Sequence, residues 1–186
     1  MPHNPALLRA DLEVLSRRAG IRTPRLHVLP ISVPIGAVLA LPGRGDVFLS
    51  RGLLQRLDRD ETAAVLAHEV AHLHHHDAAL RLFAFWAFGL AALWAGIIYA
   101  ALAMPSMGKL AAIVSWLGAL SVLREQEWRA DRTGARLLGD PEALARAVEK
   151  VHGEADSAWL GGLFCTHPPP GLRAARLRRM ASSPAA

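Results

Sequence analysis

His68-Glu69-Val70-Ala71-His72 is the stretch from which the rest of this chain is best interpreted. Residues four apart on a helix lie on one face, so the two imidazoles can share one metal ion. A helix is expected because Asp58 and Glu61 have the spacing of a capping box and residues 62–67 contain neither Gly nor Pro. The HEXXH pattern therefore predicts a zinc site on a helix, with Glu69 beside a metal-bound water whose proton it can take. Two histidines on an ordinary core helix are the alternative unless a third ligand exists.

The third ligand is expected in residues 124–132, which are helical in composition. Glu127 and Asp131 are spaced i, i+4 there, which fits one ligand and one carboxylate that accepts a hydrogen bond from a ligating imidazole. The alternative is a solvated helix face on which these acids pair with neighbouring arginines. Whether Glu127 lies near the HEXXH motif depends on the segment that connects the two.

That segment is strongly apolar, since residues 82–108 carry no charge. As a helix, residues 82–104 would be about 34 Å long, enough to cross a hydrocarbon layer of about 30 Å. A turn is expected at residues 105–109, followed by a second apolar stretch to Leu123. A two-helix membrane hairpin over residues 82–123 would bring Glu127 back to the face that holds the motif. A soluble hairpin, buried in a core or a dimer interface, is the alternative.

Composition limits the classes of protein. A chain of 186 residues with 52% hydrophobic content predicts a single domain over residues 1–186. The net charge of +5 comes without an aromatic-basic pattern, so no nucleic acid is expected as a partner. Cys165 is the only cysteine, which excludes an internal disulfide. Asp11 and Glu13 interrupt the N-terminal leucines, which argues against a signal peptide.

The remaining chain predicts an α+β fold that is mainly helical. Residues 4–19 have the pattern of an amphipathic helix, and residues 25–29, 35–41 and 46–49 have the pattern of strands, the last two as a hairpin. We therefore expect a small antiparallel sheet. A short helix capped by Ser50, a helix over residues 142–152 and a basic C-terminal helix complete the prediction.

Several of these features together resemble a known family. They are the HEXXH motif, Asp77, the two hydrophobic segments, Glu127-x-x-x-Asp131, and Thr166-His167-Pro168-Pro169 with Arg173. The combination is similar to the gluzincin membrane zinc metallopeptidases of the HtpX and CAAX-prenyl-protease type. HtpX-type proteins normally begin with a further pair of transmembrane helices. The N-terminal helix of this sequence is expected to lie on the membrane surface instead.

The resemblance implies a role for each matching residue. One zinc ion per chain would be held by His68, His72 and Glu127, with Glu69 as the general base. His167 would stabilise an oxyanion, and Asp131, Arg173 and Asp77 would support the ligands. An extended substrate peptide would lie beside Val38, Leu39, Ala40 and Leu41.

The resemblance implies the function of a zinc metalloendopeptidase that acts on membrane or misfolded proteins. The arginines that flank the hydrophobic segments, against the lone Lys109 in the turn, predict an active site facing the cytoplasm from the inner membrane. A protein substrate, the lipid membrane and further copies of the chain are the expected partners. A catalytically silent membrane scaffold and a soluble helical dimer are the alternatives.

His74, His75 and His76 are expected to form a polar collar at the membrane surface, with a secondary metal site as the alternative.

Overall fold

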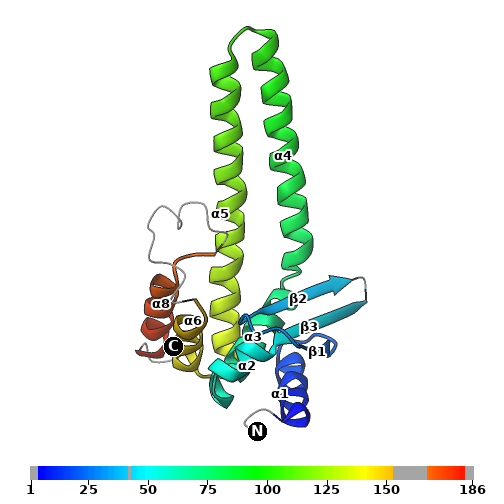
Figure 1. Cartoon of the computed structure of the whole chain (residues 1–186), viewed down its shortest axis with the longest axis vertical. Coiled ribbons are helices and arrows are strands. Elements are labelled where there is room, and N and C mark those ends of the chain that lie inside the picture. Colours follow the sequence, from blue (N-terminus) through cyan, green and yellow to red (C-terminus); the bar gives the residue numbers. More distant parts are fainter. Residues whose placement is uncertain (1–3, 42, 153–166, 183–186) are drawn as a thin grey trace.

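The computed structural model describes residues 4–41, 43–152 and 167–182. Its helices flank a small sheet, and two long helices extend from one end of the molecule (Figure 1). In chain order the elements are α1 (Pro5–Arg18), β1 (Arg25–Leu29), β2 (Gly36–Leu41), β3 (Arg44–Ser50), α2 (Arg51–Arg56), α3 (Arg59–His74), α4 (Asp77–Ala101), α5 (Pro105–Leu138), α6 (Pro141–His152) and α8 (Pro170–Ser182). The expected mainly helical α+β fold is confirmed, whereas Cys165 and Thr166 lie outside the described residues.

The sheet has the strand order β1-β3-β2. β2 and β3 pair antiparallel, which confirms the predicted hairpin. β1 pairs parallel with β3, so the sheet is mixed and the expectation of a purely antiparallel sheet was wrong for this strand. The reason is the connection through residues 30–35, which carries the chain from β1 past β3 to the opposite edge of the sheet. β3 is the central strand, and Val47 and Leu49 in it are fully buried.

α1 packs against the core through its apolar face. Leu8, Leu12 and Leu15 are buried in one cluster with Leu66 and Val70 of α3. The helix lies at the end of the molecule opposite the tip of the long hairpin (Figure 1). The expectation that this helix lies on the membrane surface was therefore wrong, because the protein core already covers its apolar face.

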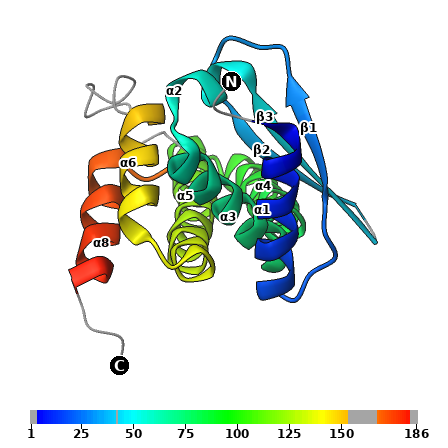
Figure 2. The same cartoon turned by 90° about the horizontal axis from the view of Figure 1, so that it is seen from below.

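α3, which carries the HEXXH motif, runs through the middle of the molecule. Seen from below, it lies between the sheet with α1 on one side and α5, α6 and α8 on the other (Figure 2). The predicted capping box is present: Asp58 Oδ1 accepts from the Glu61 N–H, and Glu61 Oε2 accepts from the Asp58 N–H, each at 2.9 Å. Burial on all sides explains why this helix has small residues such as Ala64, Ala67 and Ala71 at its contacts.

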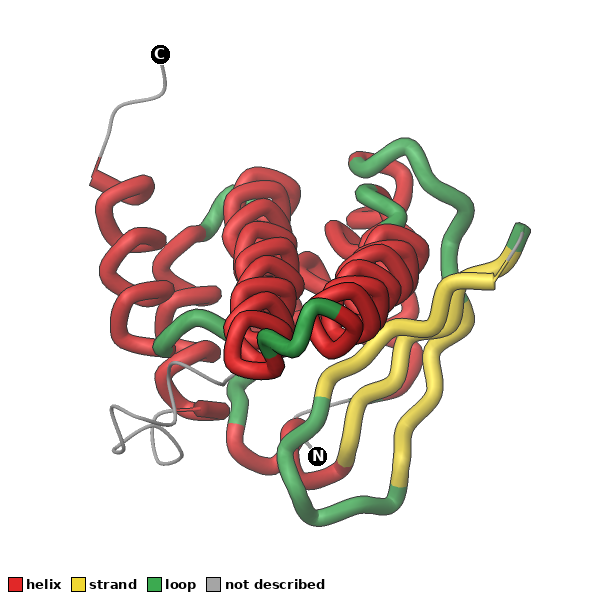
Figure 3. Tube along the Cα trace, turned by 90° about the horizontal axis from the view of Figure 1, so that it is seen from above, coloured by secondary structure: helices red, strands yellow, loops and turns green. Residues whose placement is uncertain are grey.

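α4 and α5 form the long hairpin and are both long and apolar enough to cross a membrane. Viewed from above, the two helices stand together beside the three strands (Figure 3). The apolar windows of both helices are largely exposed, which excludes a hairpin buried in the core of this chain. Large exposed apolar side chains on these helices include Leu82, Phe83, Trp86, Leu93, Trp94, Ile113 and Val114. The hairpin therefore indicates association with a membrane.

The bend of the hairpin lies at residues 102–104 rather than at the predicted residues 105–109. Pro105 is the first residue of α5, a position that suits proline because the first N–H groups of a helix have no partner within it. α5 then continues without a break to Leu138. A single helix thus carries both the second apolar stretch and Glu127.

Candidate active site

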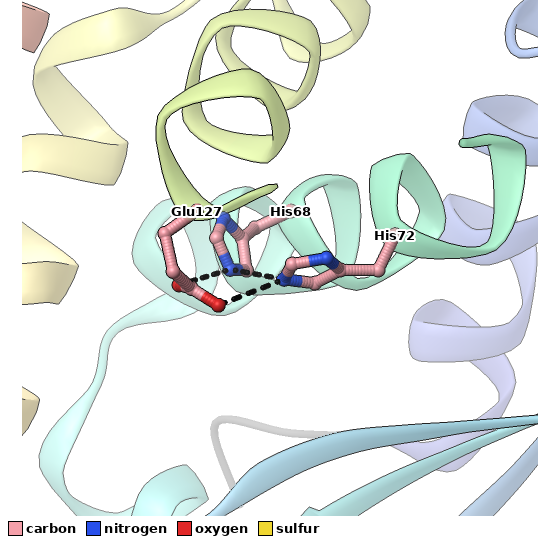
Figure 4. A group of neighbouring side chains, drawn as sticks. All are labelled: His68, His72 and Glu127. Carbon is pink, nitrogen blue, oxygen red and sulfur yellow. Dashed lines mark hydrogen bonds and ion pairs between the residues drawn. The ribbon is translucent and has the colours of Figure 1, made fainter. Parts of the chain in front are cut away.

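Three side chains meet where α5 crosses α3. His68 and His72 point from α3 toward Glu127 of α5 (Figure 4). The Nε2 atoms of the two histidines lie 3.1 Å apart. Glu127 Oε2 lies 3.5 Å from His68 Nε2, and Glu127 Oε1 lies 3.4 Å from His72 Nε2. All three residues are buried, so two imidazoles and one carboxylate face one another away from bulk water.

The distances fit a shared metal ion. Two ligand atoms that each lie about 2.1 Å from a tetrahedral zinc ion are roughly 3.4 Å apart. Two neutral imidazoles with one carboxylate also form a common donor set of catalytic zinc sites, which leaves a position open for water. The residues present therefore fit the metal that the family resemblance implies. Among the residues that the structure describes, no second group of three such ligands forms.

Both imidazoles are oriented from behind by a carboxylate. His72 Nδ1 lies 2.7 Å from Asp77 Oδ2, and His68 Nδ1 lies 3.0 Å from Asp131 Oδ1. The first contact is a well-aligned hydrogen bond, whereas the second is an ion-pair contact with a poorer angle. Each carboxylate favours the tautomer that carries hydrogen on Nδ1, which leaves the Nε2 lone pair directed toward Glu127.

Two arginines hold these carboxylates in turn. Arg173 of α8 is buried and donates to Asp131 from Nε at 2.8 Å and from Nη2 at 2.6 Å. Its Nη1 lies 3.3 Å from Glu127 Oε2. Arg129 forms a short hydrogen bond with Asp77. Sequence reasoning gave Arg129 no role at the site and considered it only in the alternative of a solvated helix face, because nothing in its spacing points to a residue on another helix.

The electrostatic surroundings of the site favour positive charge. Burial lowers the pKa of His68, but the carboxylates of Asp131 and Glu127 outweigh this effect and raise the pKa to about 10. Burial likewise lowers the pKa of His72, while Asp77 and Glu127 reverse the direction and raise it. A cation at the Nε2 atoms is therefore stabilised by the same carboxylates that orient the rings.

The close contact between α3 and α5 depends on Gly134. A Cβ atom at this position would lie 2.9 Å from the backbone N and 3.0 Å from the Cα of His68. Any side chain here would push apart the helix that carries the two histidines and the helix that carries Glu127.

We therefore expect Gly134→Ala to lower the free energy of unfolding by about 1–3 kcal/mol, because backbone atoms cannot move aside cheaply. The midpoint of thermal unfolding of detergent-purified protein measures this change. Gly171→Ala on α8 is the matched control, since a Cβ atom there meets nothing within 4 Å. A midpoint that is unchanged in Gly134→Ala would contradict the close approach of the two helices.

Glu69 lies beside the three side chains, at the edge of a strand. Burial raises the pKa of Glu69, and the neighbouring charges of His68 and His72 oppose this only in part. A raised pKa makes this carboxylate a stronger base. A Cβ atom added to Gly36 of β2 would lie 2.9 Å from Glu69 Oε1. The backbone of β2 therefore passes directly along the carboxylate.

A cavity of about 190 Å³ contains these groups. Its lining includes the His68, Glu69 and His72 side chains, Glu127, and the β2 residues from Gly36 to Val38. β2 pairs with β3 on one side only, so within the described sheet its other edge is free. A peptide could add to this edge as a further strand.

The predicted substrate residues are only partly at this cavity. Val38 lines it, whereas Leu39 is half-exposed and Ala40 packs against the core. Leu41 belongs to β2 and pairs with Arg44 at the far end of the hairpin. The part of β2 at the site begins earlier than predicted, at Gly36, because the first residues of the strand are the ones that lie against the motif helix.

His167 also lines the cavity. Its side chain is about half-exposed, and Nε2 lies 3.7 Å from Glu127 Oε1. It is thus near the three facing side chains without being one of them. Its role in stabilising an oxyanion stays a prediction.

The histidines after the motif point elsewhere. His75 Nε2 lies 2.9 Å from Thr133 Oγ1, and His74 is exposed. His76 has a left-handed backbone conformation, with φ at 54°, where the chain turns from α3 into α4. They line no shared metal site among the described residues, which removes support for the secondary site.

Sequence reasoning missed two side chains of the cavity region. Arg81 lines the cavity, and Gln126 of α5 accepts a hydrogen bond from the Arg81 side chain. A signal for Arg81 was present, since it is the single charged residue between Asp77 and Lys109. Gln126 carried none, because a polar residue beside two acids suggests a solvated face.

Comparisons with known proteins agree with this arrangement. The pattern of peptidase family M48 matches residues 3–181. The protease HtpX homolog of Thermococcus sibiricus is 31% identical, over 91% of this chain and 72% of the relative. The HtpX homolog of Methanopyrus kandleri is 34% identical, over 90% of this chain and 64% of the relative.

A solved structure shares the fold. The crystal structure of Ste24p from S. mikatae matches 95% of this chain with a TM-score of 0.68 at 20% identity. This chain spans only 50% of Ste24p, so the similarity concerns the fold of the shared part. From the match to residues 3–181 and the identities with the HtpX homologs, this chain belongs to peptidase family M48, as an HtpX-like, membrane-associated metalloprotease.

Proposed function

We propose that this chain is a zinc-dependent endopeptidase that hydrolyses peptide bonds of membrane or misfolded proteins. The observation that carries the proposal is the buried group of His68, His72 and Glu127 with Glu69 beside it in one cavity. A scaffold needs no base next to a ligand set. Residues 1–186 would form one peptidase domain, with residues 82–123 as an inserted hairpin.

Zinc, when bound by His68, His72 and Glu127, would supply Lewis acidity to a water molecule and to the scissile carbonyl. Glu69 takes the proton of the attacking water and passes it to the leaving amine, so that no net proton is gained or lost. Asp77 and Asp131 keep the two imidazoles in the ligating tautomer.

The substrate would bind in extended form along the free edge of β2. Main-chain hydrogen bonds to the strand near Val38 would hold the peptide across Glu69. His167 would donate a hydrogen bond to the oxyanion that develops at the scissile carbonyl. The arginine-rich ends of the hairpin support an inner-membrane location with the active site on the cytoplasmic side.

We expect inverted inner-membrane vesicles that contain the protein to cleave added casein, with cleavage lost on chelation and restored by zinc. Right-side-out vesicles should not cleave casein, because the active site would lie inside them and the casein outside. Detergent should restore cleavage by giving casein access to the site. Vesicles with Glu69→Gln protein measure the background. Cleavage that survives complete removal of metal would exclude the zinc mechanism. Cleavage by sealed right-side-out vesicles would exclude the cytoplasmic orientation.

A catalytically silent scaffold is the second candidate. It would keep a structural metal at the same side chains, or no metal, and leave casein intact in every vesicle. Wild-type protein that holds zinc but cleaves nothing would favour this function.

A further inference from the structure

Arg81 is a cation in the wall of the active-site cavity that the catalytic roles above do not use. It lies one turn after Asp77 on α4, at the base of the hairpin. Its side chain is partly buried and lines the same cavity as Glu69 and His167. The position therefore places a guanidinium beside the groups that would act on a peptide.

A buried residue holds the Arg81 side chain in this place. Arg81 Nε donates to Gln126 Oε1 at 3.3 Å. Gln126 is only 1% exposed, and its Nε2 donates to the carbonyl oxygen of Asp77 at 3.3 Å. The guanidinium is thus fixed against the α5 wall of the cavity. An arginine that anchors the hairpin in lipid headgroups would instead extend outward.

Unlike the arginines near it, Arg81 has no carboxylate partner among the described residues. Arg173 is paired with Asp131, and Arg129 is paired with Asp77. Within the described ranges, Arg81 forms no ion pair, and its hydrogen-bond acceptor is a neutral amide. Arg81 lines the cavity, and the guanidinium has further N–H donors that an incoming group can use.

We propose that Arg81 determines substrate specificity by binding a carboxylate of the substrate peptide close to the scissile bond. A planar guanidinium pairs with a carboxylate through two parallel hydrogen bonds, which a neutral amide or a lysine side chain in the substrate cannot offer. Peptides with Asp or Glu at one position next to the cleaved bond are then preferred. The inference rests on the proposed peptidase function.

Matched fluorogenic peptides test this preference. They differ only by Glu, Gln or Lys at one of the three positions on either side of the cleaved bond. For the wild type we expect kcat/KM to be about 10-fold higher with Glu than with Gln at one position, mainly through KM, as one charge-assisted contact predicts. The preference should disappear in Arg81→Gln, survive in part in Arg81→Lys, and change to Lys in Arg81→Glu. A preference that is reversed by reversing the charge cannot arise from misfolding.

Arg132→Gln is the matched control. Arg132 lies on α5, pairs with the exposed Glu125 and is not part of the cavity lining. This variant should keep the wild-type preference. Equal Glu-to-Gln ratios in the wild type and in Arg81→Gln would overturn the proposal.

A binding measurement separates this proposal from the proposed peptidase function. Fluorescence anisotropy of the same labelled peptides with Glu69→Gln protein requires no cleavage. If the wild type cleaves no peptide, but protein that has Arg81 still binds the Glu peptide more tightly than the Gln peptide, then the role of Arg81 in peptide binding holds and the peptidase function fails. If Arg81→Gln leaves the ratio of the affinities for the Glu and Gln peptides unchanged, Arg81 does not select the peptide and the proposal is wrong.

Discussion

Glu69→Gln is expected to reduce peptide hydrolysis by about 100- to 10,000-fold, the usual contribution of a positioned general base. The amide has nearly the shape of the carboxylate, so it preserves the packing against Gly36 of β2. It cannot accept the proton of the attacking water. Metal content should stay at the wild-type value, because the three facing ligand atoms belong to other residues. Initial rates on casein, together with metal analysis by plasma mass spectrometry, measure both quantities.

Glu125→Gln is the matched control for this variant. Glu125 is exposed on α5 two residues before Glu127, and its partner is Arg132. The same chemical change there should leave the rate of hydrolysis as it is. Hydrolysis retained by Glu69→Gln at a rate near that of the wild type would show that another group is the base.

His72→Ala and Glu127→Ala should each abolish stoichiometric zinc binding. Each removes one of three ligands, a larger loss than the about 10- to 100-fold in metal affinity that removal of a supporting partner costs. His72→Ala also leaves the buried carboxylate of Asp77 with Arg129 as its partner, so correct folding is checked by the helical circular dichroism signal. Plasma mass spectrometry of detergent-purified protein gives the number of zinc ions per chain.

Two neighbouring residues serve as controls for the metal measurement. His74 is exposed near the end of α3, and Glu125 is exposed on α5. Their alanine variants should bind zinc as the wild type does. If Glu127→Ala keeps its zinc while the fold is intact, the third ligand is a different residue, and a structural metal in a silent scaffold becomes the better explanation.

Local patterns made much of the fold predictable. Capping by Asp58 and Glu61 and the i, i+4 spacing of the histidines involve residues that are close in sequence. The apolar lengths of α4 and α5 were equally visible, because a membrane requires a minimum length of apolar chain. The expectation that Glu127 meets the motif followed from the same lengths, since a hairpin returns to its starting face.

Predictions failed where contacts between distant segments decide the outcome. The amphipathic pattern of residues 4–19 is the same for a helix on a membrane and for a helix on a core, and only the packing of Leu8 and Leu12 on α3 distinguishes them. Strand patterns contain no direction, so the parallel pairing of β1 was not foreseen.

Sequence by itself therefore determined which residues can bind a metal and act as a base, and that two helices leave the body of the protein. Only the tertiary structure decided which neighbours these residues have. It brought the backbone at Gly36 against Glu69, placed Gly134 at the crossing of α3 and α5, and turned Arg81 into the cavity. The physical reason is that spacing along a helix sets the direction of a side chain, whereas its distance to another segment depends on the packing of the whole core.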